Sequence, residues 1–156
     1  MSFQKAHNVS NELAEVVVTS DEIDLNTTAV TNLPVQPLYK NYRVLEVGFV
    51  VIQNSVETTN LQVLFGTPSN DDGIVDETAA LTIPANSFGT TFSTSTGAFA
   101  FQNISDPDVE VTQVDADGVP RISAGDRIIF EVSAGAGQPT RACVFARLAP
   151  SIEYKD

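Results

Sequence analysis

Residues 43–53, RVLEVGFVVIQ, constrain the fold of this chain more than any other segment. The first half alternates polar and apolar residues, whereas the second half is the unbroken apolar run Phe49-Val50-Val51-Ile52. Alternation is typical of a strand with one solvated face, and a continuous apolar run is typical of a strand covered on both faces. We therefore expect a central strand. Glu46 would lie near solvent, and the second half would lie between an opposing sheet and a further covering layer, from this chain or from a neighbouring subunit.

The other strong patterns also have the period of two that characterises strands. Residues 60–67 alternate Leu61, Val63 and Phe65 with other side chains, and residues 125–133 do the same. We expect residues 43–53 and 60–67 to form one hairpin, and residues 125–133 and 141–150 to form a second. No window has a sustained helical pattern with caps. Short strands separated by frequent turn signals predict an all-β antiparallel β-sandwich, either jelly-roll-like or Ig-like.

The first part of the chain has a different texture. Residues 21–41 mix acids, Thr and Asn with Pro34 and Pro37, which disfavour a paired central strand. We therefore predict an extended N-terminal arm or edge segment over residues 1–38, which wraps its own sandwich or reaches a partner. The β-sandwich domain would occupy residues 39–156, and a chain of 156 residues fits one such domain.

The charge of the chain bears on its partners. The formal net charge is −12, and no Lys or Arg occurs between Arg43 and Arg121. An acidic surface repels phosphate backbones, so we expect no nucleic-acid partner. No apolar run approaches the roughly 18–20 residues of a membrane helix, so we expect no membrane insertion. The first residues, MSFQKAHNVSNE, have no apolar stretch after a basic start, so we also expect no secretory signal.

Few residues offer catalytic or metal-binding chemistry. His7 is the single histidine and Cys143 the single cysteine, so neither a catalytic triad nor a thiolate metal cluster is expected. Cys143 lies between apolar residues, which favours an inert buried thiol. The acidic residues 70–77 carry enough oxygen atoms for a calcium site, and this possibility stays open. We expect no enzymatic activity, no cofactor and no dedicated metal site.

A family resemblance adds to these inferences. The segments YRVLEVGFVVIQ, NLQVLFGT, DDGIVDET, TIPAN, AGDRIIFEVSAG and TRACVFARLAP follow one another in an order that resembles small β-sandwich structural proteins of tailed-bacteriophage virions. The resemblance covers residues 39–149. It implies a head decoration, or cement, protein on the outer surface of the capsid, made in the host cytoplasm and without catalytic residues.

Several expectations about partners follow from this resemblance. The implied partner is the major capsid protein, and self-association into a homo-oligomer, such as a trimer, is also expected. A tail, neck or fibre component and a carbohydrate- or receptor-binding module are the alternatives. The expected contact residues are apolar residues on a segment that reads as too irregular for the core: Phe3, Leu33, Val35, Leu38 and Tyr39.

Overall fold

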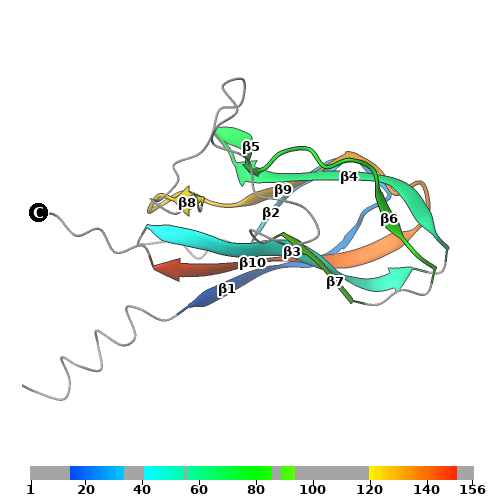
Figure 1. Cartoon of the computed structure of the whole chain (residues 1–156), viewed down its shortest axis with the longest axis horizontal. Helices are drawn as coiled ribbons and strands as arrows, with labels where there is room; N and C mark the ends of the chain where they lie inside the picture. Colours follow the sequence, from blue (N-terminus) through cyan, green and yellow to red (C-terminus); the bar gives the residue numbers. More distant parts are fainter. Residues whose placement is uncertain (1–14, 34–40, 55, 86–88, 94–119, 151–156) are drawn as a thin grey trace, which may run out of the picture.

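The computed structural model of the chain describes residues 15–33, 41–54, 56–85, 89–93 and 120–150, and none of these residues is helical. The described residues form ten strands (Figure 1). Their bounds are β1 Val16–Asp24, β2 Ala29–Asn32, β3 Tyr42–Asn54, β4 Thr58–Thr67, β5 Asn70–Val75, β6 Leu81–Ile83, β7 Gly89–Ser93, β8 Arg121–Ile122, β9 Ile129–Ala134 and β10 Thr140–Pro150.

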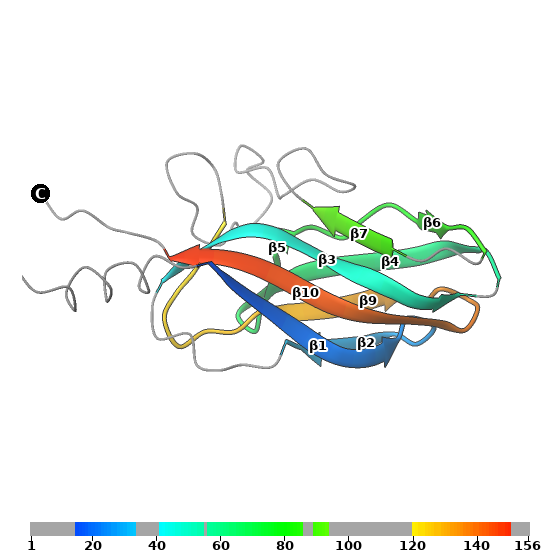
Figure 2. The same ribbon diagram turned by 90° about the horizontal axis from the view of Figure 1, so that it is seen from below.

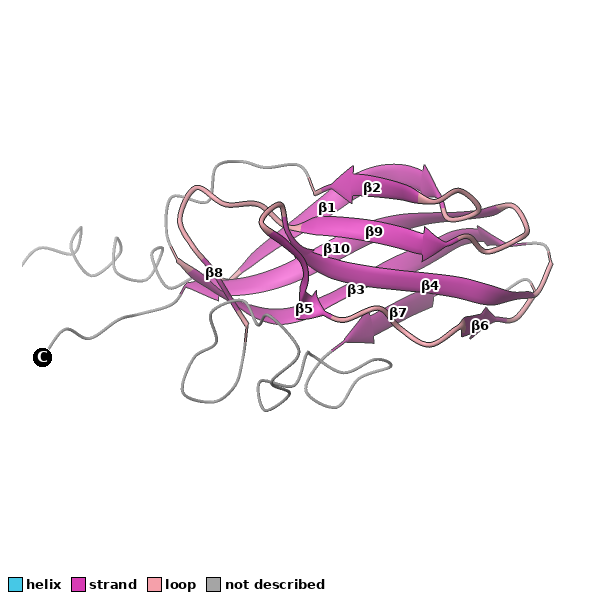
Figure 3. Ribbon diagram, turned by 90° about the horizontal axis from the view of Figure 1, so that it is seen from above, coloured by secondary structure: helices cyan, strands magenta, loops and turns pink. Residues whose placement is uncertain are grey.

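These strands make two antiparallel sheets that pack face to face. Sheet A has the order β1-β10-β3-β7, with β8 also paired to β3 (Figure 2). Sheet B has the order β2-β9-β4-β5, with β6 also paired to β4 (Figure 3). The predicted all-β sandwich is therefore confirmed, and β3 is the interior strand that its sequence predicted.

The pairing identifies the kind of sandwich. The strands pair in mirror order about the β4–β5 turn: β1 with β10, β2 with β9, β3 with β7 and β4 with β5. This is the pairing of one long hairpin rolled up into two sheets, which is the jelly roll. Of the two predicted architectures, the described strands follow the jelly roll.

Both predicted hairpins are wrong. β3 and β4 are consecutive along the chain but belong to different sheets, and so do β9 and β10. Packed sheets lie ~10 Å apart, and an extended chain covers roughly 3.3 Å per residue. A link of a few residues is therefore long enough to carry the chain from β3 to β4, and from β9 to β10. The period of two identified the strands, but it carries no information about which strand each one pairs with.

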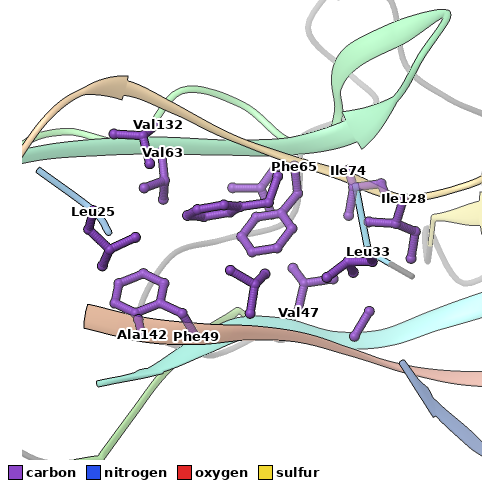
Figure 4. Packing of buried hydrophobic residues seen from close by; sticks show 14 of the residues in the cluster. Leu25, Leu33, Val47, Phe49, Val63, Phe65, Ile74, Ile128, Val132 and Ala142 are labelled. Carbon is purple, nitrogen blue, oxygen red and sulfur yellow. The ribbon is translucent and has the colours of Figure 1, made fainter. Parts of the chain in front are cut away.

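The core lies between the sheets and is built from the inward side chains of both (Figure 4). Phe130 of β9 packs near Phe65 of the same sheet and Phe49 of the other, with ring centroids 5.0 and 6.2 Å apart respectively. All three rings are fully buried. Tilted aromatic pairs of this kind contribute about 0.5–1.5 kcal/mol each beyond the burial of area.

Two β-bulges explain the pattern of residues 43–53. The register of β3 against β10 skips Leu45 and Ile52, so each is an extra residue on β3. In the apolar run, Phe49 and Val51 face the core, while Val50 and Ile52 face outward and remain 37% and 40% exposed. The further covering layer that the run predicted is therefore incomplete.

The described part of the N-terminal segment belongs to the sandwich. β1 is an edge strand of sheet A and β2 is an edge strand of sheet B. Leu25 and Leu33 are 0% and 1% exposed in the core. Residues 15–33 therefore match the edge segment of the prediction for residues 1–38 rather than a separate arm. Residues 1–14 and 34–40 lie outside the described part of the chain.

Candidate functional site

The two sheets differ sharply in charge. Every basic residue that lies in a described strand is in sheet A: Arg43, Arg121, Arg141 and Arg147. The same sheet has four acidic residues in its strands: Asp21, Glu22, Asp24 and Glu46. The described strands of sheet B have no basic residue and three acids, Asp71, Asp72 and Glu131. Sheet A is thus balanced in charge within a strongly acidic chain.

Strands β1, β10 and β3 lie side by side in sheet A (Figure 2). We call the surface of their outward side chains the contact face. Burial alternates residue by residue along most of β10, so the inward and outward side chains are well defined. Opposite residues on paired strands share a face, and the register therefore arranges the contact face in rows. Its residues are Val17, Thr19, Glu22, Asp24, Arg43, Glu46, Gly48, Val50, Ile52, Gln53, Arg141, Cys143, Phe145, Arg147 and Ala149.

The middle of the contact face is apolar. Cys143 lies opposite Val50, and Phe145 lies opposite Gly48. An aromatic residue across from a strand glycine compensates for the side chain that the glycine lacks. Ile52, the extra residue of the second bulge, adds a further exposed aliphatic group. The thiol of Cys143 was predicted to be buried, but Cys143 is only half-buried because β10 directs it outward.

Ion pairs flank this apolar middle at both ends. At one end Arg141 donates a hydrogen bond to Glu22. At the other end the guanidinium of Arg147 lies 3.1 Å from Glu15 and 3.9 Å from Glu46. These residues belong to three different segments, so the pairs cross the sheet from strand to strand.

The ion pairs act on charge rather than on stability. The hydrogen bond and the charge of Glu22 raise the pKa of Arg141, whose guanidinium is charged at any physiological pH in either case. Exposed pairs of this kind contribute little to stability, because solvent screens them. Their effect on the contact face is that Arg141 and Arg147 are already matched by anions of the same chain.

The outer face of sheet B provides a comparison. Val30, Glu131 and Leu64 lie in one row across β2, β9 and β4. Val30 is 54% exposed, more than either Val50 or Ile52, but its neighbour in the row is a carboxylate. An exposed valine beside an acid, on a sheet whose described strands have no cation, is typical of a solvated surface.

The predicted contact residues do not form this surface. Leu33 follows β2 directly and is buried in the core. Its backbone amide donates a hydrogen bond to the carbonyl of Ile128. Phe3, Val35, Leu38 and Tyr39 lie outside the described residues. The sequence analysis did not predict the contact face. Its signals in the sequence were the apolar run of β3 and the arginines at positions 43, 141 and 147.

The acidic residues 70–77 do not converge within the described structure. Asp71 and Asp72 are neighbours on β5, where successive side chains point to opposite faces. The Asp76 carboxylate accepts a hydrogen bond from the Glu77 amide. In the described part of the chain, no three His, Cys, Asp or Glu residues gather closely enough to hold a metal ion.

Comparisons with known proteins add no relative. No protein-family model matches the chain, and neither a curated protein nor a solved structure matches it. Within the described residues there is also no helix with the length and apolar character needed to cross a bilayer.

Proposed function

We propose that this chain is a virion structural protein, a capsid decoration protein that stabilises the head shell through non-covalent contacts between capsomers. The observation that carries the proposal is the difference between the two outer faces of the jelly roll. One face combines exposed aliphatic groups with balanced charge, and the described strands of the other have acids without a cation. Such a difference suits a protein that lies on a larger surface with one side in contact and one side in solvent.

The fold and the sequence resemblance support the same role. Jelly rolls recur among viral capsid and lectin domains, so the architecture is one that virion proteins use. The resemblance over residues 39–149 to structural proteins of tailed-phage virions is independent of the contact face. The proposed partner is the major capsid protein, and the proposed location is the outer surface of the capsid.

Repetition is what would make such contacts effective. A specific and stable protein interface buries about 1,600 Å² in total. Smaller contacts, repeated at equivalent sites over a shell, hold the shell together when each copy touches more than one capsomer, because linked contacts act at high effective concentration. Self-association of the chain into a homo-oligomer would increase this effect.

Co-sedimentation of the purified chain with stripped heads of its source virus tests the proposal. Saturable binding at a fixed copy number per capsomer is the expected result. A folded, soluble protein that does not bind heads would overturn it. The tail, neck or fibre role would then be tested by labelling intact virions, and the carbohydrate-binding role by a glycan array.

A further inference from the structure

We infer that the contact face of sheet A is the surface by which this chain docks on the shell, and that it takes a flat, apolar and nearly uncharged patch of shell protein. This inference rests on the proposed function and specifies which surface performs it. Its residues come from β1, β10 and β3, which lie side by side in sheet A.

The apolar middle of the face gives the partner its chemistry. Val50 and Ile52 are both more than one-third exposed on the outer face of β3. Val50 has paired residues on both sides, in β10 and β7, whereas Ile52 is the extra residue of the bulge and lies beyond the described pairing with β7. Phe145 and Cys143 lie beside them on β10. With Val17 of β1, which is 59% exposed, Val50 and Ile52 put three exposed aliphatic side chains on one face of the sheet. Burial against an apolar partner would remove the remaining exposed area of these side chains from water.

The charges exclude a strongly charged partner. Sheet A has four basic and four acidic residues in its strands. The whole chain has 20 acidic and 8 basic residues. Without the four of each kind in these strands, 16 acidic and four basic residues remain elsewhere. A basic partner would therefore bind elsewhere on the chain. The contact face has Arg141 and Arg147 already paired with Glu15, Glu22 and Glu46, and so fits a surface that is close to neutral.

The size of the face favours the shell over a second copy of this chain. Three strands spaced by ~4.8 Å and the 11 residues of β10 give a flat area of roughly 14 by 37 Å, about 500 Å². A stable free dimer needs about 800 Å² per partner. Two copies would also bring two charges of −12 together. A shell avoids both difficulties, because it offers many sites and adds contacts beyond the face.

Matched aspartate substitutions test the inference by co-sedimentation with stripped heads. Val50→Asp and Ile52→Asp place a carboxylate in the apolar middle of the contact face. Val30→Asp is the control, because it makes the same change at a more exposed valine on sheet B. We expect each contact-face variant to bind at least about tenfold more weakly, because an unpaired carboxylate would be buried in the interface. The Val30→Asp variant should bind within about twofold of the unaltered chain, because Val30 is on sheet B and outside the contact face.

A salt series supplies a second readout. Attachment through an apolar, internally neutralised face should change by less than about threefold between low and high salt, because screening acts mainly on unpaired exposed charges. A steep loss of binding with salt would overturn the inferred chemistry. Circular dichroism and urea unfolding of each variant establish that it is folded before binding is compared.

The outcomes separate this inference from the proposed function. No binding by the unaltered chain means that the proposed function fails. If the unaltered chain binds and the Val50→Asp and Ile52→Asp variants bind equally well, the docking face is wrong while the decoration role stands. The same holds if Val30→Asp abolishes binding. Sedimentation of the free proteins, without heads, covers the remaining case. If the unaltered chain is a dimer and Ile52→Asp dissociates it, a second copy occupies the contact face and the inference is overturned.

Discussion

The hydroxyl of Ser20 accepts a hydrogen bond of 2.9 Å from the backbone amide of Val144. It does so where β1 bulges: Thr19 lies opposite Phe145 and Glu22 opposite Cys143, so Ser20 and Asp21 share a single opposite residue. A bulge disrupts the ladder of backbone hydrogen bonds. The buried side chain of Ser20 supplies the acceptor for the Val144 amide in the middle of β10.

Ser20→Ala should therefore destabilise the chain by about 1–2 kcal/mol, because it leaves a buried amide without an acceptor. Urea unfolding measures the change. Thr19→Ala, at the exposed preceding residue, is the control and should lie within about 0.5 kcal/mol of the unaltered chain. Equal effects of the two substitutions would show that the Ser20 hydroxyl has no special role at the bulge.

Strand β4 illustrates what the sequence could and could not predict. The alternation of Leu61, Val63 and Phe65 identified a strand and its buried face correctly, because side-chain direction follows from local backbone geometry. The pairing partners were not predictable in the same way. Whether β4 pairs with β3 or with β5 and β9 depends on contacts between segments far apart in the chain, which no local period records.

The candidate site was missed for a related reason. An unbroken apolar run predicted two covered faces for the second half of β3, and the bulge at Ile52 was not visible in it. The contact face combines residues from both ends of the chain, for example Val17 of β1 and Arg147 of β10. Its composition became apparent only when the register placed these residues in one row.

Gly135 should tolerate no side chain. A Cβ added there would overlap the backbone carbonyl of Asn26, in the turn that links β1 to β2. The adjacent amide of Ala136 bonds to the carbonyl of Leu25 at 2.9 Å, so the two loops are held together at this point. We expect Gly135→Ala to cost about 2–3 kcal/mol, because the backbone itself must move.

Gly125→Ala is the matched comparison for that substitution. Gly125 has a φ of 83° but open space around its Cβ position. Its replacement should cost roughly 1–2 kcal/mol, the usual penalty for a left-handed residue with a side chain. A Gly135 variant that unfolds at the same urea concentration as the Gly125 variant would contradict the close approach between the two loops.

Truncations test the place of the N-terminal segment in the fold. Removing residues 1–14 leaves every described strand in place, so cooperative thermal unfolding should be retained. Removing residues 1–33 also deletes β1, β2, Leu25 and Leu33. Each buried leucine alone is worth about 2–5 kcal/mol against a total stability of about 5–15 kcal/mol. The longer truncation should therefore lose its cooperative transition.

The same truncations separate folding from binding. Because Phe3 lies within residues 1–14, co-sedimentation of the shorter truncation with heads measures the contribution of that predicted contact residue. A longer truncation that still unfolds cooperatively would show that residues 15–33 are an arm after all, as the sequence suggested for residues 1–38.

Two buried threonines at one end of the sandwich should respond in opposite directions to the same substitution. Thr58 is 1% exposed, and its hydroxyl has no hydrogen-bond partner. Thr140 is 0% exposed, and its hydroxyl donates to the carbonyl of Gln138 at 3.2 Å. Valine has nearly the shape of threonine without the hydroxyl. Thr140→Val should therefore cost about 1 kcal/mol, whereas Thr58→Val should be neutral or stabilise the chain by up to about 1 kcal/mol.

Urea unfolding of the two valine variants decides the matter, and Thr58→Ser separates the effect of the methyl group from that of the hydroxyl. Asn54 is a candidate for a shared partner, because Thr58 lies opposite Ile83 and the Asn54 amide nitrogen donates to the carbonyls of Ile83 and Pro84. The side-chain oxygen of Asn54 is also buried and unpaired. If Thr58→Val is as destabilising as Thr140→Val, the Thr58 hydroxyl must be satisfied, and a buried water between it and the Asn54 oxygen would account for the loss. If Thr58→Val stabilises the chain, the two unpaired oxygens are a true cost of closing this end of the sandwich.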